Sequence, residues 1–314
     1  MREMLTITVP ASGMKKSIAF GSAMLALSLL AAPALSQTTP NLSPQDIEAR
    51  AQIKKINAKK VILVGDSTTA VLGGWGPSFC GHHLSSFVAC INLARGGRST
   101  FNYIAEGSWD IALSEMKSGG FSKTYVLIQF GHNDQPGKPG RSTDLENEFP
   151  QLLKRYVNEA RAVGAIPVLV TPLTRRGFKN GVLETDLAPW AAATRKVAAE
   201  LNVPLVDLYA RSQSEVQAMG PVAAMRFAQK PPSPEVLEAG KTGTTISGAT
   251  GVPVAPAQTP LTEEQIRNAQ EPLGQAKLSF DYTHLGREGA DFFSKIVAYE
   301  LARAVPELKR DLIP

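Results

Sequence analysis

The chain lacks the residue patterns that mark several specialised classes of protein. Its 314 residues include only two cysteines and four histidines, and these lack the spacing of metal ligands, so we expect no metal site. Lysine and arginine form no cluster of the kind that binds nucleic acid. General disorder is not expected either, because 43% of the residues are hydrophobic and 19% are charged. The length suits one large domain or, as an alternative, two small ones.

The apolar run near the N-terminus is too short for an ordinary membrane span. It extends from Ile18 to Ala32, whereas a span needs about 20 residues. Lys15 and Lys16 precede it, and the small-residue stretch Ala34–Ser36 follows. This order is typical of a secretory signal peptide. We therefore expect residues 1–36 to be removed on export, with an N-terminal anchor as the alternative.

If residues 1–36 are removed on export, residues 37–314 are expected to form a single mature domain. This domain would lie in a periplasm or outside the cell, with no membrane attachment. The formal net charge falls from +5 to +3, which is compatible with an acidic substrate but does not indicate one. Met1 and Met14 are both possible starts of the precursor. In an oxidising compartment Cys80 and Cys90 are expected to form a disulfide, worth about 3 kcal/mol in the chain-entropy model.

Five short apolar segments are predicted to be strands, because they are rich in β-branched residues and several end at glycine or proline. The last has the weakest pattern. They are Val61–Val64, Phe87–Leu93, Thr124–Phe130, Ile166–Val170 and Pro204–Leu208.

Segments with helical periodicity lie between and after these strands. In Leu145–Val163 the apolar residues recur on one face, and Thr143 or Asp144 is placed to cap its start. Pro189–Leu201 and Arg287–Val305 are further predicted helices. Alternating strands and helices predict a parallel sheet covered on both faces, with its functional site outside the carboxyl ends of the strands.

One stretch, Lys230–Gln275, has no sustained periodicity and is rich in proline, glycine, threonine and alanine. Most of it is interpreted as a surface loop insertion, with a short helix at Leu261–Ala269 capped by Thr262. It precedes the last predicted helix, so it is placed either to wall a cleft or to extend freely from the domain.

Polar residues and glycines follow three of the predicted strands. Ser67 comes directly after the first strand, beside Gly65. Gly96 and Gly97 follow the second, where glycines let backbone N–H groups point at a ligand. Asn133 follows the third and has an amide that can donate to a developing oxyanion. Taken singly, each is also typical of an ordinary turn.

Asp281 and His284 lie just before the last predicted helix. A carboxylate three residues before a histidine reaches its ring Nδ1–H, holds the tautomer and stabilises the imidazolium. In isolation, a helix-capping or core role would be the better interpretation of His284. The three groups that follow strands are expected at one edge of one sheet, and the Asp281–His284 pair supplies a base. This combination favours a serine hydrolase.

These blocks resemble those of the SGNH (GDSL-type) hydrolase superfamily, named for its Ser, Gly, Asn and His. More narrowly, they resemble the rhamnogalacturonan acetylesterases and their bacterial relatives, carbohydrate esterase family twelve. The resemblance covers about Val61 to Val305 apart from the insertion, and all the blocks in this order are highly specific. The segments that carry it are GDSTTA at 65–70, NLARGGRST at 92–100, IQFGHNDQPGKPGRST at 128–143, IPVLVTPLTRR at 166–176 and DYTHLGREGA at 281–290.

The resemblance implies a flavodoxin-like three-layer α/β/α sandwich with a central parallel sheet, the SGNH hydrolase fold. It implies Ser67 as nucleophile, His284 as base and Asp281 as the residue that orients the base. The oxyanion hole would consist of the backbone N–H groups of Ser67 and Gly97 and the side-chain amide of Asn133. This design needs no metal or organic cofactor.

Four further residues are candidates for the substrate side of the site. Asp66 either braces the nucleophile turn or serves as a structural cap. Trp75, Arg98 and His132 are candidates to line a sugar site, and Arg98 could pair with a uronate carboxylate. Ordinary surface or packing roles are the alternative for these three.

Three functions are compatible with this sequence. The first is a secreted esterase, expected to be a monomer, that removes O-acetyl groups from an acetylated polysaccharide or oligosaccharide, rhamnogalacturonan above all. The second is an acetylxylan esterase, or a lipase-like or general short-acyl esterase. The third is a non-catalytic carbohydrate-binding protein, which the intact set of Ser, Gly, Asn, Asp and His residues argues against.

Overall fold

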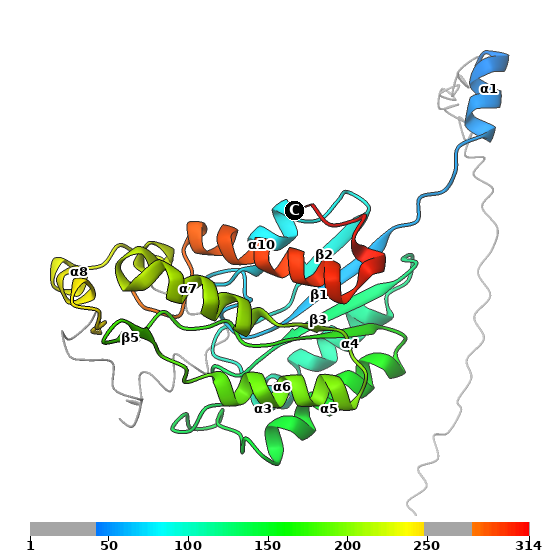
Figure 1. The fold of residues 1–314 in the computed structure, drawn as a ribbon. Coiled ribbons are helices and arrows are strands. Elements are labelled where there is room, and N and C mark those ends of the chain that lie inside the picture. Colours follow the sequence, from blue (N-terminus) through cyan, green and yellow to red (C-terminus); the bar gives the residue numbers. More distant parts are fainter. Residues whose placement is uncertain (1–41, 248–277, 314) are drawn as a thin grey trace, which may run out of the picture. The chain divides into compact units, whose positions relative to one another are not determined.

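The computed structural model of the chain describes residues 42–247 and 278–313 (Figure 1). The predicted signal peptide and the predicted helix at Leu261–Ala269 lie outside these residues. Among the described helices, none is long and apolar enough to cross a membrane.

The chain divides into two units, residues 1–54 and 55–314. In the first unit, helix α1 (Pro44–Ala51) begins after Ser43, whose hydroxyl oxygen accepts a hydrogen bond from the backbone N–H of Asp46. This helix buries none of its residues. All the other described elements belong to the second unit.

The second unit is built on a five-stranded parallel sheet with the strand order β2-β1-β3-β4-β7. β1 lies between β2 and β3, so that Leu63 pairs with Asn92 on one side and with Leu127 on the other. The strands are β1 (Lys59–Gly65), β2 (Val88–Asn92), β3 (Thr124–Gln129), β4 (Ile166–Val170) and β7 (Leu205–Val206). All five predicted strands are present, and the one with the weakest pattern is shortened to two residues.

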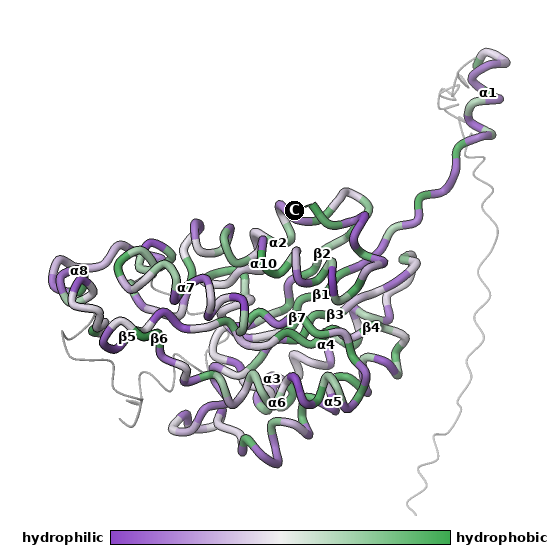
Figure 2. The backbone as a smooth tube through the Cα atoms, viewed as in Figure 1, coloured by the Kyte–Doolittle hydropathy of each residue, from purple (hydrophilic) through white to green (hydrophobic). Residues whose placement is uncertain are grey.

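Alternate strand residues face two separate cores. Val61 and Leu63 of β1 contribute to one core, and Ile62 and Val64 contribute to the other. Side chains alternate across a strand, so a sheet covered on both faces requires the continuous apolar runs seen in the sequence. Figure 2 shows these strands as hydrophobic segments inside the more polar helices. The predicted α/β/α sandwich is confirmed.

Helices cover both faces of the sheet (Figure 1). The first core contains side chains of α2 (Gly76–His82), α7 (Leu208–Ala224) and α10 (Arg287–Ala304). The second core contains side chains of α3 (Thr100–Ala105), α4 (Ser108–Lys117), α5 (Glu148–Ala162) and α6 (Ala188–Glu200). Two short 3-10 helices, η1 (Met225–Phe227) and η2 (Pro306–Leu308), follow α7 and α10.

The predicted cap of the helix at 145–163 is wrong in detail. The helix begins at Glu148, after Asn147, and that N-cap makes no side-chain cap bond. Asp144 instead organises the preceding turn, where its Oδ1 accepts hydrogen bonds from the backbone N–H groups of Glu146 and Asn147.

The first part of the predicted loop insertion is a helix, which corrects the sequence interpretation. Helix α8 (Pro234–Lys241) begins after Ser233, whose hydroxyl oxygen accepts from the backbone N–H of Val236. Val236 is buried in a small cluster with Met225 and Tyr282. With one buried apolar position and only eight residues, α8 is too short to show a helical period in the sequence.

A two-stranded antiparallel hairpin, β5 (Phe178–Lys179) and β6 (Val182–Leu183), was also missed by the sequence analysis. Residues of the insertion are bonded to it. Thr245 donates its backbone N–H to the carbonyl of Phe178 and its hydroxyl oxygen accepts from the Phe178 N–H. The described start of the insertion is therefore bound to the domain and does not extend freely from it.

Cys80 of α2 and Cys90 of β2 form the predicted disulfide. The bond links a helix of the first core to the edge strand of the sheet. It closes a loop whose ends lie ten residues apart in the sequence.

Candidate active site

The nucleophile turn, which carries the predicted nucleophile Ser67, directly follows β1. The carbonyl of Asp66 accepts from the backbone N–H groups of Thr69 and Ala70, so the chain reverses immediately after the strand. The Asp66 carboxylate, which is fully buried, accepts from both the N–H and the hydroxyl of Thr68, at 2.8 and 2.7 Å. These bonds leave Ser67, a half-buried residue, at the tip of the turn.

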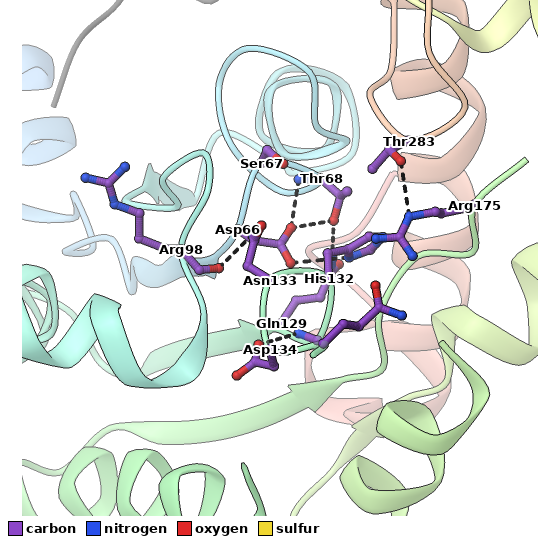
Figure 3. Close-up of polar contacts among 12 residues, drawn as sticks. Asp66, Ser67, Thr68, Arg98, Gln129, His132, Asn133, Asp134, Arg175 and Thr283 are labelled. Atoms are coloured by element: carbon purple, nitrogen blue, oxygen red, sulfur yellow. Dashed lines mark hydrogen bonds and ion pairs between the residues drawn. The ribbon is translucent and has the colours of Figure 1, made fainter. Parts of the chain in front are cut away.

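A chain of buried hydrogen bonds, from Trp75 through Gln129 to Thr68, supports this turn on the side of the core. The indole N–H of Trp75 donates to Gln129 Oε1 at 2.7 Å, and the Gln129 amide donates to the hydroxyl oxygen of Thr68. Thr68 in turn donates to Asp66 (Figure 3). Asp66 also lies 3.3 Å from Nδ1 of His132. Burial opposes its charge, but the pairing with His132 and the bonds from Thr68 hold the pKa of Asp66 below its usual value.

Ser67, His284 and Asp281 form a continuous chain of hydrogen bonds. His284 Nε2 lies 2.9 Å from Ser67 Oγ, and His284 Nδ1 lies 2.8 Å from Asp281 Oδ2. The other carboxylate oxygen of Asp281 accepts from the backbone N–H groups of Thr283 and His284, which fixes the carboxylate relative to the ring. Burial opposes ionisation, but the bonds from His284 and Thr283 hold the pKa of Asp281 below its usual value.

A buried arginine that the sequence analysis did not select holds the loop that carries Asp281 and His284. Arg176 follows β4, and its side chain is fully buried. Its guanidinium donates to the carbonyl oxygens of Asp281, Thr283 and His284, at 3.0, 3.3 and 2.9 Å. Its backbone N–H donates to the carbonyl of Tyr282. The positions of Asp281 and His284 are therefore set by a residue that follows a strand of the sheet.

The two other predicted oxyanion donors lie beside the nucleophile turn. Gly97 has φ = +76°, a left-handed conformation that favours glycine, and a Cβ placed on Gly96 would lie 3.7 Å from Ser67 Cβ. The amide of Asn133 donates one hydrogen bond, to the carbonyl of Arg98 at 3.0 Å. Its second N–H has no such bond among the described residues. The structure thus brings Ser67, Gly97 and Asn133 together at the carboxyl edge of the sheet.

The residues predicted to line a sugar site do not do so. Trp75 is fully buried and His132 is 2% exposed, so neither offers a surface to a polymer. Asp66, which was expected to brace the nucleophile turn or cap it, is buried and bonds to Thr68 within that turn. Arg98 is 8% exposed and is paired with Glu106, and Figure 3 shows its guanidinium pointing away from Ser67. Their sequence positions correctly predict that these side chains lie near the site. Because they are buried, they support the site and do not contact the substrate.

Other cations, missed by the sequence analysis, lie at the site. Arg141 Nη1 is 3.5 Å from Asn133 Oδ1, and Lys138 donates to the carbonyl of His132. Arg175 donates to the Thr283 hydroxyl oxygen (Figure 3). It also pairs with Asp186. All three cations lie within the segments 128–143 and 166–176 that carry the family resemblance, but nothing in their spacing distinguishes them from surface arginines and lysines.

In the described ranges no group of three or more His, Cys, Asp and Glu residues is arranged to hold a metal ion. The candidate site contains the hydroxyl of Ser67, the imidazole of His284, the carboxylate of Asp281 and the amide of Asn133.

This fold and these residues define a class of protein that the comparisons also identify. Residues 63–221 match the GDSL-like Lipase/Acylhydrolase family, and the chain belongs to that family. It is a carboxylic ester hydrolase of the SGNH type.

Two curated relatives come from Bacillus subtilis strain 168. One, named rhamnogalacturonan acetylesterase RhgT, is 39% identical over 176 residues, which cover 54% of this chain and 72% of the relative. The other, named probable rhamnogalacturonan acetylesterase YesY, is 37% identical over 162 residues, which cover 49% of this chain and 72% of the relative.

A solved structure supports the fold. The crystal structure of the protein YXIM from Bacillus subtilis has a TM-score of 0.54 and is 19% identical, and the match covers 79% of this chain. This chain spans 57% of that protein's resolved chain. At this identity the likeness concerns the fold alone.

Proposed function

We propose that this protein is an exported serine esterase that removes O-acetyl groups from a plant-type polysaccharide, rhamnogalacturonan. The observation that carries the chemistry is the line of hydrogen bonds from Ser67 Oγ through His284 to Asp281, at 2.9 and 2.8 Å. The substrate is inferred from the two relatives named as rhamnogalacturonan acetylesterases. Export is inferred from the basic, apolar and small-residue pattern before Gln37.

The proposed reaction begins when Ser67 Oγ attacks the acetyl carbonyl and His284 Nε2 takes its proton. Asp281 holds the ring in the required tautomer and stabilises the imidazolium that forms. The negative charge on the carbonyl oxygen is met by the backbone N–H groups of Ser67 and Gly97 and by the free amide N–H of Asn133. Removing one such donor typically lowers the rate by about 10²–10³.

The tetrahedral intermediate then collapses, and His284 gives the proton to the departing sugar oxygen. A water molecule attacks the acetyl-enzyme with His284 again acting as base, which releases acetate and regenerates the Ser67 hydroxyl. No redox step occurs, so the balance is one ester and one water converted to one alcohol and one acetic acid.

The proposal is tested by acetate release from acetylated rhamnogalacturonan and from acetylated xylan by residues 37–314. The same assay is run with Ser67→Ala and with Ser86→Ala, a matched change at an exposed serine. We expect release from the pectic polymer by the parent chain and by Ser86→Ala. In Ser67→Ala we expect a fall of at least about 10³-fold, because the nucleophile is lost.

Other outcomes separate the parts of the proposal. Release from xylan alone would retain the mechanism and overturn the substrate. Equal activity of Ser67→Ala and the parent chain would overturn the mechanism. A series of p-nitrophenyl esters whose hydrolysis increases beyond butyrate would replace the carbohydrate esterase with a lipase-like enzyme.

A further inference from the structure

Arg141 lies at the proposed oxyanion hole without an acidic partner. Its Nη1 is 3.5 Å from the Oδ1 of Asn133, and a Cβ placed on Gly97 would lie 3.6 Å from the same nitrogen. The side chain is half-buried, and burial lowers its pKa. No carboxylate of residues 42–247 or 278–313 forms an ion pair with it. A guanidinium taken partly out of water without a counter-charge is costly, which points to a ligand that supplies one.

The two buried carboxylates that act on Lys138, those of Asp66 and Asp134, are engaged elsewhere. Asp66 is bonded to Thr68 and lies against His132. Asp134 accepts from the backbone N–H of Gly131 and from Thr100. Neither has a free oxygen directed at a substrate, because both side chains are fully buried.

Positive charge therefore accumulates on this side of the site. Arg175 and Arg141 are close enough to Lys138 to act with burial in lowering its pKa to about 8. Arg175 is neutralised by Asp186, but no carboxylate in the described parts of the chain pairs with Lys138 or Arg141.

We propose that Arg141 binds a carboxylate of the substrate, so that the enzyme selects acetyl esters carried on uronate-containing carbohydrate. A guanidinium binds a carboxylate through two parallel hydrogen bonds, and partial burial strengthens them. Because Arg141 contacts Asn133 and approaches Gly97, the bound uronate is the acetylated sugar itself or its direct neighbour. This inference rests on the proposed esterase function and deepens it by naming a specificity residue.

The sequence analysis considered Arg98 as a partner for a uronate carboxylate, with a packing role as the alternative, and the contacts of Arg98 favour that alternative. Arg98 is committed to Glu106 and to the carbonyl of Gly96, and its guanidinium points away from Ser67 (Figure 3). Its own carbonyl holds the amide of Asn133 in place. Arg98 therefore supports the oxyanion donor, and Arg141 faces the substrate.

The test compares an acetylated oligosaccharide that contains uronate with a neutral ester, p-nitrophenyl acetate. The variants are Arg141→Met and Arg141→Lys, with Lys309→Met as a control that removes the same charge. Lys309 is exposed and directly follows η2. The carbonyl of Glu307 in η2 accepts from Lys59 at the start of β1, so Lys309 lies near the edge of the sheet opposite the site.

For Arg141→Met we expect kcat/KM on the acidic substrate to fall at least about tenfold more than on the neutral ester, as expected for a charge-assisted bond. Arg141→Lys keeps the charge but cannot form two parallel hydrogen bonds, so its kcat/KM on the acidic substrate should lie between those of the parent chain and Arg141→Met. Lys309→Met should behave as the parent chain. Equal losses on both substrates would overturn the proposal, because Arg141 would then act only by orienting Asn133.

A second measurement does not depend on turnover of the polymer. A non-acetylated oligogalacturonate should inhibit hydrolysis of p-nitrophenyl acetate by the parent chain, and its inhibition constant should rise about tenfold in Arg141→Met. An unchanged constant would overturn the carboxylate site. Inhibition that depends on Arg141 in an enzyme that does not deacetylate rhamnogalacturonan would retain the site and overturn the proposed polymer.

Discussion

Lys138 is the cation at the site whose charge changes closest to neutral pH. Burial and the neighbouring Arg175 and Arg141 lower its pKa to about 8, while Asp66 and Asp134 act in the opposite direction. Lys138 is therefore positively charged below pH 8 and neutral above it. Loss of this charge weakens the attraction of the site for an acidic substrate and leaves a neutral ester unaffected.

We therefore predict that KM for a uronate-containing substrate rises as the pH is increased from 7 to 9, while KM for p-nitrophenyl acetate stays flat. In Lys138→Met, KM for the acidic substrate should already be high at pH 7 and should not change further. Steady-state kinetics at the two pH values check this. The same increase in Lys138→Met would assign the titration to another group.

The sequence predicts some residues of this site better than others, and the difference has a physical basis. Ser67, Gly97 and Asn133 directly follow strands of a parallel sheet, so topology alone gathers them at one edge. The roles of Trp75 and His132 depend on burial, which a single sequence does not encode at a polar or aromatic position. For these two residues the packing alternative was the correct one.

Among the elements, the loop that carries Asp281 and His284 is held mainly by Arg176, and Arg175 donates a further hydrogen bond to Thr283. Three guanidinium bonds from Arg176 reach carbonyls of this loop. Leaving buried carbonyls without donors costs roughly 1–3 kcal/mol each. The hydrogen-bonded line from Asp281 to Ser67 therefore depends on a residue after β4.

We predict that Arg176→Met lowers both the melting temperature and kcat, with a smaller change in KM, because the base loses its alignment with Ser67. Arg176→Lys should recover part of kcat. Arg155→Met is the control, since its exposed pair with Glu159 on α5 contributes little stability. Thermal melts and kinetics at 25 °C measure these effects. A variant with a lower melting temperature but an unchanged kcat would show that Arg176 stabilises the fold without positioning the base.

The elements that the sequence analysis missed include short ones and also α7, a helix of 17 residues that is kinked at Gly220. The β5–β6 hairpin has two residues in each strand, and α8 has eight residues, so neither spans enough chain to show a period. Both gain their stability from tertiary contacts, as with Val236 of α8 in its cluster with Tyr282. Tyr282 lies between the two catalytic candidates in the sequence, so part of the insertion supports the site.

At the scale of the whole molecule, everything that defines the candidate site belongs to residues 55–314. Both cores, the sheet and the residues from Ser67 to His284 lie in this unit. The single described helix of residues 1–54, α1, buries none of its residues. A helix of eight residues without buried contacts contributes little to the stability of a fold.

We predict that a chain beginning at Lys55 has the same melting temperature and the same kcat/KM on p-nitrophenyl acetate as residues 37–314. The physical reason is that no apolar surface is exposed by removing a helix that buries none. Thermal melts and kinetics of the two chains, measured side by side, check this expectation. A melting temperature lowered by more than about 4 °C, equivalent to roughly 1–2 kcal/mol in a domain of this size, would show that residues 37–54 are part of the folded unit.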